Sequence, residues 1–182
     1  MRRAPPLITL PGYLGSPPTH WQSLWEVEDP TITRFQPTSV TEPDRDDWVA
    51  ALASAIDAAP APPLLIAHSL ACLIIPFTPR PIAGAFIVAP PDPDDPHFPA
   101  PATTFKDVPQ TPLPFPAVVV ASINDPYGSL EHAERRARDW GAGFLSVGSE
   151  GHINAQSGLG DWPEGKNLLK AFAAGLGQPL PA

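Results

Sequence analysis

The sequence predicts an α/β fold with three layers, α/β/α, around a mainly parallel β-sheet. Short apolar runs alternate along the chain with amphipathic segments that carry helix-capping residues. Continuous apolar runs are typical of strands buried on both faces, as in parallel sheets covered by helices. No internal repeat is visible and no linker separates two folding units, so residues 1–182 are predicted to form one domain.

Composition and charge exclude several classes of protein. Hydrophobic residues make up 43% of the chain and charged residues 16%, which fits a globular protein and not a disordered one. The net charge of −8 and the lack of a basic stripe argue against nucleic-acid or anionic-membrane partners. The single Cys72 and the short apolar run at residues 7–10 give no sign of a disulfide or a secretory signal. We therefore expect a cytoplasmic protein.

The first elements expected are a buried strand at residues 7–10 and a helix at residues 19–26. Thr19 is a suitable N-cap for that helix, with Gln22 three residues later. A short strand is expected at residues 31–35.

The clearest helix covers residues 44–59. From Trp48 onward its apolar residues recur at i, i+1, i+4, i+5 and i+8, which gives a single apolar stripe. Aspartates crowd its first turn, where the helix dipole favours negative charge. Prolines at 60–63 end this helix, and a buried strand at 64–67 and a short helix from Leu70 are expected next.

Proline dominates the middle of the chain. Of the 28 prolines, many lie between residues 90 and 116, where they exclude a central strand or a long helix. A loop this long inside a compact domain is typically a lid, a binding loop or a partly disordered segment. The other elements expected are strands at residues 82–89, 117–121 and 143–147 and helices at residues 129–140 and 164–176.

Three polar residues follow apolar runs in the order serine, acid, histidine. Ser69, Asp125 and His152 each lie just past an expected strand. Because the carboxyl ends of parallel strands meet at one edge of a sheet, these side chains are expected to lie together there. Their chain order is that of the triad of α/β hydrolytic enzymes, in which serine attacks, histidine takes its proton and the acid orients the imidazole.

A nucleophilic serine of this kind lies on a sharp turn between strand and helix. The residues two before and two after it must be small, because the two backbones nearly touch there. Glycine is usual at these positions, whereas Ala67 and Ala71 flank Ser69 here. Alanine is the next smallest residue, so the turn remains possible.

Position in the chain selects among the other candidate bases and acids. The remaining histidines precede the serine, adjoin it, or lie in the proline-rich segment or inside a helix: His20, His68, His97 and His132. Asp107 and Asp139 are rivals to Asp125, but one lies in the proline-rich segment and the other late in a helix. The sequence therefore favours His152 and Asp125.

Backbone amides near Ser69 must stabilise the charge that develops on a substrate carbonyl. Leu70 is one expected donor, and the glycine-containing loop after the first strand supplies the other, with Tyr13 preferred over Leu14. Glycines in that loop allow a tight turn and close approach of the substrate. Four side chains are expected to bind substrate: Leu14, Trp21, Tyr127 and Trp162.

Signals for cofactors and metals are weak. Gly158 and Gly160 follow no strand and lack a properly spaced third glycine, and no phosphate-binding Gly-Lys-Ser/Thr motif is present. An acidic group in the proline-rich segment is typical of a solvated loop: Asp92, Asp94, Asp95 and His97. We expect neither a cofactor nor a metal ion.

Several segments together resemble a known family. They are PGYLGS at 11–16, HWQSLW at 20–25, HSL at 68–70, VAPPD at 88–92, SINDPY at 122–127 and, most specifically, GHINA at 151–155 with SGLGDWP at 157–163. In these the chain is similar to the small single-domain serine hydrolases typified by retinoblastoma-binding protein nine, which include many bacterial members. The resemblance covers nearly the whole chain. It implies an α/β-hydrolase fold without a large helical cap, with its triad at Ser69, Asp125 and His152.

Three hypotheses follow. The first is a serine hydrolase that cleaves a small ester or amide through an acyl-enzyme, with an ester favoured because its leaving group needs less acid assistance. The second is a binding protein that keeps the fold but has lost turnover, which only the alanines beside Ser69 support. The third makes Cys72 the nucleophile. The expected partner is a small-molecule ester or amide substrate, and the sequence does not identify a protein partner.

Overall fold

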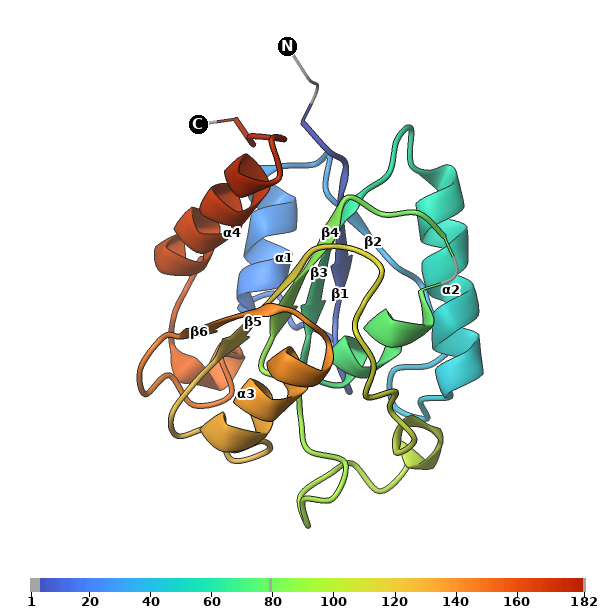
Figure 1. Cartoon of the computed structure of the whole chain (residues 1–182), viewed down its shortest axis with the longest axis vertical. Coiled ribbons are helices and arrows are strands. Elements are labelled where there is room, and N and C mark those ends of the chain that lie inside the picture. The colour runs from blue at the N-terminus through green and yellow to red at the C-terminus, as the bar shows by residue number, and fades with distance from the viewer. Residues whose placement is uncertain (1–3, 79, 182) are drawn as a thin grey trace.

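Six parallel strands form one sheet within the part of the chain that the computed structural model describes, residues 4–78 and 80–181 (Figure 1). Strand order across the sheet is β2-β1-β3-β4-β5-β6, and every neighbouring pair is parallel. The strands are β1 (Leu7–Leu10), β2 (Thr33–Arg34), β3 (Leu64–His68), β4 (Gly84–Val88), β5 (Ala117–Ala121) and β6 (Gly143–Ser146).

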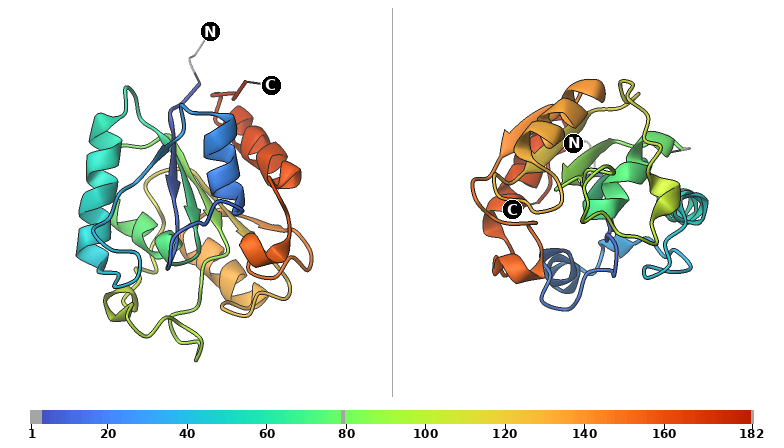
Figure 2. Two further views of the ribbon diagram at one scale, coloured as in Figure 1. Left: turned by 180° about the vertical axis from the view of Figure 1, so that it is seen from behind. Right: turned by 90° about the horizontal axis from the view of Figure 1, so that it is seen from below.

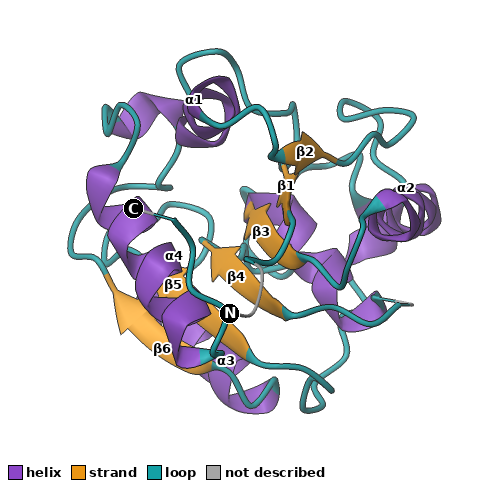
Figure 3. Ribbon diagram, turned by 90° about the horizontal axis from the view of Figure 1, so that it is seen from above, coloured by secondary structure: helices purple, strands orange, loops and turns teal. Residues whose placement is uncertain are grey.

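Helices cover both faces of the sheet (Figure 3). One face carries α1 (Trp21–Glu28) and α4 (Pro163–Gly175). The other carries α2 (Arg45–Ala58), α3 (Leu130–Asp139) and the 3-10 helix η1 (Ser69–Phe77). The predicted three-layer α/β/α fold is therefore confirmed, with element boundaries close to those that the sequence predicts.

Alternation along the strands divides the core into two layers. In β3, Leu65 and Ala67 pack with the side of α2, α3 and η1, whereas Leu64 and Ile66 pack with the side of α1 and α4. Because successive side chains of a strand point to opposite faces, a fully apolar strand fills both layers at once. This explains why β3, β4 and β5 are continuous apolar runs.

Side-chain caps set the start of several helices. Asp44 caps α2 and Ser129 caps α3, each accepting a hydrogen bond from a backbone amide in the first turn. The predicted cap of α1 is wrong, because His20 and not Thr19 precedes that helix. The Nδ1 atom of His20 accepts a hydrogen bond from the Gln22 amide at 3.1 Å.

The side chain of Gln22 joins three segments instead of taking part in the cap. It is fully buried, and its amide nitrogen donates to the carbonyl oxygens of Leu10 and Ile66 at 3.3 and 3.0 Å. Its oxygen accepts from the Ser16 hydroxyl at 2.7 Å. The loop after β1 is thereby fixed to the carboxyl ends of β1 and β3.

Strand order reverses between β1 and β3, because the chain runs outward from β1 to β2 and in the opposite direction from β3 to β4. Ligands of open α/β sheets bind at the carboxyl ends of the strands beside such a reversal. The proline-rich segment 90–116 begins at this end of the molecule, away from both termini, and then crosses back to the start of β5 (Figures 1 and 2). No helix in the described residues is long and apolar enough to span a membrane.

Candidate active site

Ser69 lies on a sharp turn between β3 and η1. Its φ of 55° is in the left-handed region, which is unfavourable for a residue with a side chain. Ala67 and Ala71 on either side are fully buried, so a methyl group fits at both positions. A strained serine at the end of a central strand is the geometry of a nucleophile elbow.

Gly12 makes close contact with this turn. A Cβ atom at Gly12 would lie 2.8 Å from the Cβ of Ser69 and 2.9 Å from the carbonyl oxygen of His68, which is closer than real Cβ atoms approach. Only glycine permits this contact. The sequence suggests that glycines in this loop admit the substrate, whereas at Gly12 the serine turn itself occupies the space.

Three side chains form a continuous hydrogen-bonded chain at the carboxyl edge of the sheet. The Oγ of Ser69 lies 2.7 Å from Nε2 of His152, and Nδ1 of the same ring lies 2.9 Å from both carboxylate oxygens of Asp125. The side chains of His152 and Asp125 are 8% and 3% exposed, so water competes little for these bonds. Because a carboxylate only accepts, Nδ1 carries the proton and Nε2 of the neutral ring can accept the serine proton.

Polar side chains after β5 hold the loop that carries His152. The Ser122 hydroxyl accepts a hydrogen bond from the Glu150 amide at 2.8 Å and donates to Oδ1 of Asn124 at 2.9 Å. The same Asn124 oxygen accepts from the Gly151 amide at 2.8 Å. In the sequence, the only sign of these roles is that two short polar residues, Ser122 and Asn124, lie close to Asp125.

The backbone amides near Ser69 differ in whether they are free to donate a hydrogen bond to a substrate oxyanion. The amide of Leu14 donates to the Val40 carbonyl at 2.9 Å, so this second choice of oxyanion donor is already bonded. In the described part of the chain, no turn, loop or cap hydrogen bond engages the amide of Tyr13 or Leu70. Both residues line the pocket beside Ser69.

The pocket beside Ser69 has a volume of about 960 Å³ and is lined by the loops after β1, β4, β5 and β6 and by the turn after β3. Leu14, 62% exposed, and Tyr127 both line it, and the Tyr127 ring packs edge-on against the imidazole of His152 with centroids 4.6 Å apart. The proline-rich segment contributes three lining residues: Pro91, His97 and Pro99.

Trp21 and Trp162 do not line this pocket, so its lining does not support their predicted role in substrate binding. They are 1% and 2% exposed and pack with Trp25 in the core between the sheet, α1 and α4. An aromatic residue that lies close to the site in the sequence can pack in the core as readily as it can line a pocket. Only the path of the loops decides which of the two it does.

Two further histidines lie behind the hydrogen-bonded chain, and both are neutral at physiological pH. Burial, then the positive charge of Arg34 and the electrostatic influence of His152, lower the pKa of His20 to about 4. Burial, then the neighbouring His20 and His152, lower the pKa of His68 well below its ordinary value. The rings of His20 and His68 are 4.8 Å apart, and that of His68 is 5.0 Å from that of His152.

Cys72 and the acidic cluster do not compete for this chemistry. The thiol of Cys72 is fully buried and donates to the Val88 carbonyl at 3.2 Å, and burial raises its pKa well above the ordinary value. A thiol without solvent access or thiolate character is a poor nucleophile. In the described ranges, no group of three or more His, Cys, Asp or Glu side chains is arranged to hold a metal ion.

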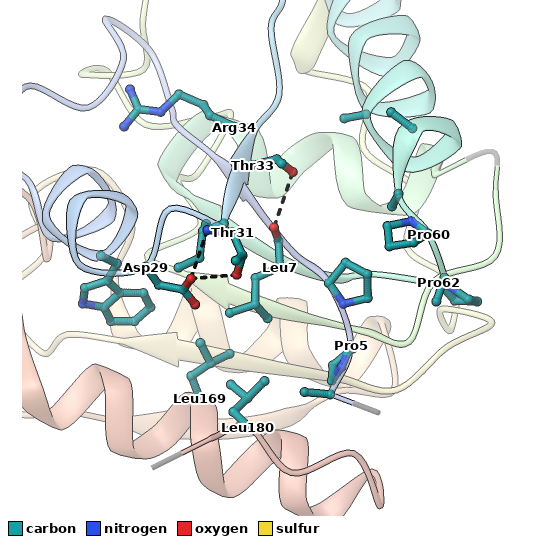
Figure 4. Close-up of a pocket in the computed structure, with 18 of the residues that line it drawn as sticks. Pro5, Leu7, Asp29, Thr31, Thr33, Arg34, Pro60, Pro62, Leu169 and Leu180 are labelled. Carbon is teal, nitrogen blue, oxygen red and sulfur yellow. Dashed lines mark hydrogen bonds between the residues drawn. The ribbon is translucent and has the colours of Figure 1, made fainter. Parts of the chain in front are cut away.

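A second, larger pocket of about 1130 Å³ lies at the opposite, amino end of the strands (Figure 4). Its lining includes Leu7 at the start of β1, Thr33 of β2 and Leu169 of α4, with several prolines. Asp29 accepts hydrogen bonds from the amide and hydroxyl of Thr31 at its rim. No member of the serine–histidine–aspartate chain lines it, so size alone does not mark the reactive end of the molecule.

These features define an α/β-hydrolase of minimal size, with a parallel sheet, a serine elbow and, among the residues that the structure describes, no large helical cap. The sequence profile of the serine hydrolase family matches residues 7–171, and the chain belongs to this family. The family resemblance inferred from the sequence is therefore confirmed. No curated protein sequence matches the chain significantly.

Solved structures agree with this assignment. A protein from Pectobacterium atrosepticum described as a YdeN-like hydrolase is 32% identical, with a TM-score of 0.82 over 93% of this chain and 91% of that one. The ydeN gene product of B. subtilis is 18% identical, with a TM-score of 0.75 over 92% and 98% of the two chains. Mouse alpha/beta hydrolase domain-containing protein 10, 14% identical with a TM-score of 0.70 over 97% and 91%, shares the fold.

Proposed function

We propose that this hydrolase cleaves a small ester, or an amide, through a covalent acyl-enzyme on Ser69. The observation that carries the proposal is the unbroken chain from Ser69 Oγ through His152 to Asp125, with contacts of 2.7 and 2.9 Å. A serine hydroxyl is a weak nucleophile until an adjacent base accepts its proton. Here His152 is that base, and Asp125 is the partner that fixes its tautomer.

In the first half of the reaction, Ser69 Oγ attacks the substrate carbonyl carbon while its proton passes to Nε2 of His152. The carbonyl oxygen becomes an oxyanion, which the amides of Tyr13 and Leu70 stabilise. The bond to the leaving group then breaks, and the leaving oxygen or nitrogen takes the proton from Nε2. Asp125 stabilises the imidazolium that exists between these two proton transfers.

In the second half of the reaction, the same steps occur with water as the nucleophile. His152 takes a proton from the water as its oxygen attacks the acyl carbon, and the resulting tetrahedral species collapses with release of Ser69 Oγ. The proton returns to that oxygen, and the products are a carboxylic acid and the regenerated enzyme. A small substrate fits a pocket of about 960 Å³ that the exposed Leu14 and Tyr127 help to line.

A fluorophosphonate probe tests this proposal, because it phosphonylates only an activated serine. We expect stoichiometric labelling of the wild-type chain at Ser69, located by peptide mass analysis, together with hydrolysis of p-nitrophenyl esters of short acyl chains. Labelling should disappear in Ser69→Ala. A wild-type protein that neither labels nor hydrolyses any ester of the series would favour the alternative of a binding protein without turnover.

A further inference from the structure

The loop at residues 150–153, here called the histidine loop, holds a costly backbone conformation. Gly151 and Ile153 on either side of His152 have φ values of 57° and 48°. Glycine adopts this region freely, but for a β-branched residue such as isoleucine it is a marked outlier. Such a conformation persists only where surrounding contacts impose it.

Two buried donors from outside the loop provide such contacts on successive carbonyl groups. The carbonyl oxygen of His152 accepts a hydrogen bond from Nε2 of His68 at 3.0 Å. The carbonyl oxygen of Ile153 accepts one from the indole Nε1 of Trp21 at 2.8 Å. His68 is 5% exposed and Trp21 is 1% exposed, so both bonds are shielded from water.

The tautomer of His68 follows from this contact. A carbonyl oxygen only accepts, so Nε2 of His68 carries the proton in the neutral ring. Burial keeps that ring neutral, which avoids a second positive charge beside His152 when the latter takes up the serine proton. His68 also immediately precedes Ser69, so one residue links the serine turn to the loop that bears the base.

We propose that His68 and Trp21 are positioning residues, which hold the backbone of His152 so that its ring bridges Ser69 and Asp125. This inference rests on the proposed function. In the described part of the chain, the hydrogen bonds of these two side chains to the histidine loop end on backbone carbonyls and not on Ser69 Oγ or the His152 ring. Their contribution is to keep Nε2 within hydrogen-bonding distance of Oγ while Nδ1 faces the carboxylate, since small displacements of a catalytic group cost large factors in rate.

Trp25 offers a matched control for Trp21. Both tryptophans belong to α1, both are almost fully buried, and the indole Nε1 of Trp25 likewise donates to a backbone carbonyl, that of Asp161. Trp21→Phe and Trp25→Phe therefore remove the same type of bond from the same core. Only the first of these bonds ends on the histidine loop.

The experiment compares kcat and KM for a p-nitrophenyl ester, with the thermal midpoint of each variant. Trp21→Phe should lower kcat about ten- to a hundredfold, with KM nearly unchanged. Trp25→Phe should lower the thermal midpoint by a similar amount but leave kcat within about threefold of wild type. Equal losses of kcat in both variants, or no loss in Trp21→Phe, would overturn the role of Trp21.

For His68, substitution by glutamine or leucine separates the hydrogen bond from packing. Glutamine can place an amide N–H near the position of Nε2, so His68→Gln should recover most of the kcat that His68→Leu loses. The downfield proton resonance of the His152 Nδ1–H, bound to Asp125, should stay sharp in His68→Gln and broaden in His68→Leu. If both His68 variants keep wild-type kcat and a sharp resonance, the inference fails.

Because both donors hold one loop, the Trp21→Phe/His68→Leu double variant should lose less kcat than the product of the single losses. Failure of this inference is distinct from failure of the proposed function. A wild-type protein that does not label with fluorophosphonate refutes the hydrolase mechanism. If the wild type, Trp21→Phe and His68→Leu all label normally and at equal rates, only the positioning role is refuted.

Discussion

At the scale of single residues, the site depends on a few side chains whose size and hydrogen-bonding capacity are both constrained. Ser69 is held at a φ of 55°, and Gly12 must lack a side chain for the serine turn to form beside it. His152 is bonded through both ring nitrogens, which leaves it one orientation. The proposed chemistry therefore depends on residues none of which can be substituted on its own without disturbing the site.

Ser69→Ala should abolish ester hydrolysis and covalent labelling while the protein stays folded, because a partly exposed hydroxyl contributes little to stability. His152→Ala should be nearly as damaging. The double variant should be hardly worse than either single one, since groups that act as a unit give strongly non-additive losses. Steady-state kinetics of the three proteins provide the check, and additive losses would mean that His152 acts separately from Ser69.

Asp125→Asn should leave the structure close to native but lower kcat by about 10⁴, because an amide favours the wrong tautomer of the imidazole. Asp107→Asn and Asp139→Asn serve as controls, since neither carboxylate contacts the ring in the described structure, and both should be mild. Kinetics at saturating ester distinguish the three. A severe Asp139→Asn with a mild Asp125→Asn would refute the assignment of the acid.

The sequence predicts Ser69, Asp125 and His152 because the chain order and the strand ends are local features that a parallel sheet converts into proximity. It does not predict Trp21 as a donor to the histidine loop or Gln22 as the link between β1 and β3. Both contacts join segments that are far apart in sequence. Nothing in the residues on either side of such a bond reveals its partner.

At the scale of elements, the turn from β3 into η1 determines where the nucleophile and one oxyanion donor lie. β3 is paired on both sides, with β1 and β4, so its end is fixed. η1 begins at Ser69 itself and buries six consecutive residues from Leu70 to Ile75. A shift of η1 would therefore move the Leu70 amide away from the serine.

Ala71→Leu should produce such a shift. Ala71 is fully buried, and a larger branched side chain must displace η1, at a cost of about 1–3 kcal/mol in stability. Displacement of the Leu70 amide should lower kcat by about 10²–10³, the effect of losing one oxyanion donor. Ala71→Gly should keep its activity. Thermal midpoints measured beside kcat separate misfolding from mispositioning, and a stable, fully active Ala71→Leu would refute the elbow.

The strands and most helices are predictable because apolar runs and capping residues are encoded within each element. The sequence predicts a short helix from Leu70 but not the nine-residue 3-10 geometry of η1, which contains Pro76 and packs against β3, β4 and α2. The true cap of α1 is also hidden. Histidine at position 20 caps through Nδ1, a role that Thr19 would ordinarily be expected to fill.

At the scale of the whole molecule, the buried polar side chains of the site lie together at the carboxyl ends of the strands. Three imidazoles lie in series there, those of His20, His68 and His152, behind a nucleophile that needs a neutral base. Burial keeps His20 and His68 uncharged, so the site avoids repulsion against the imidazolium that forms during the reaction. The cost of this arrangement should appear as acid sensitivity of the fold.

The free energy of unfolding should fall as the pH is lowered from about 6.5 to about 4, because the unfolded chain binds protons at His20 and His68 that the folded chain excludes. Well above pH 6.5 both histidines are neutral in either state, so they contribute no pH dependence there. With a folded pKa of about 4, His20 alone accounts for a loss of about 3 kcal/mol across this window. Urea unfolding at several pH values measures the slope. His20→Asn keeps a cap acceptor for α1 but removes the titrating ring, so its slope should be smaller by about one proton, and an unchanged slope would show that His20 is not held neutral.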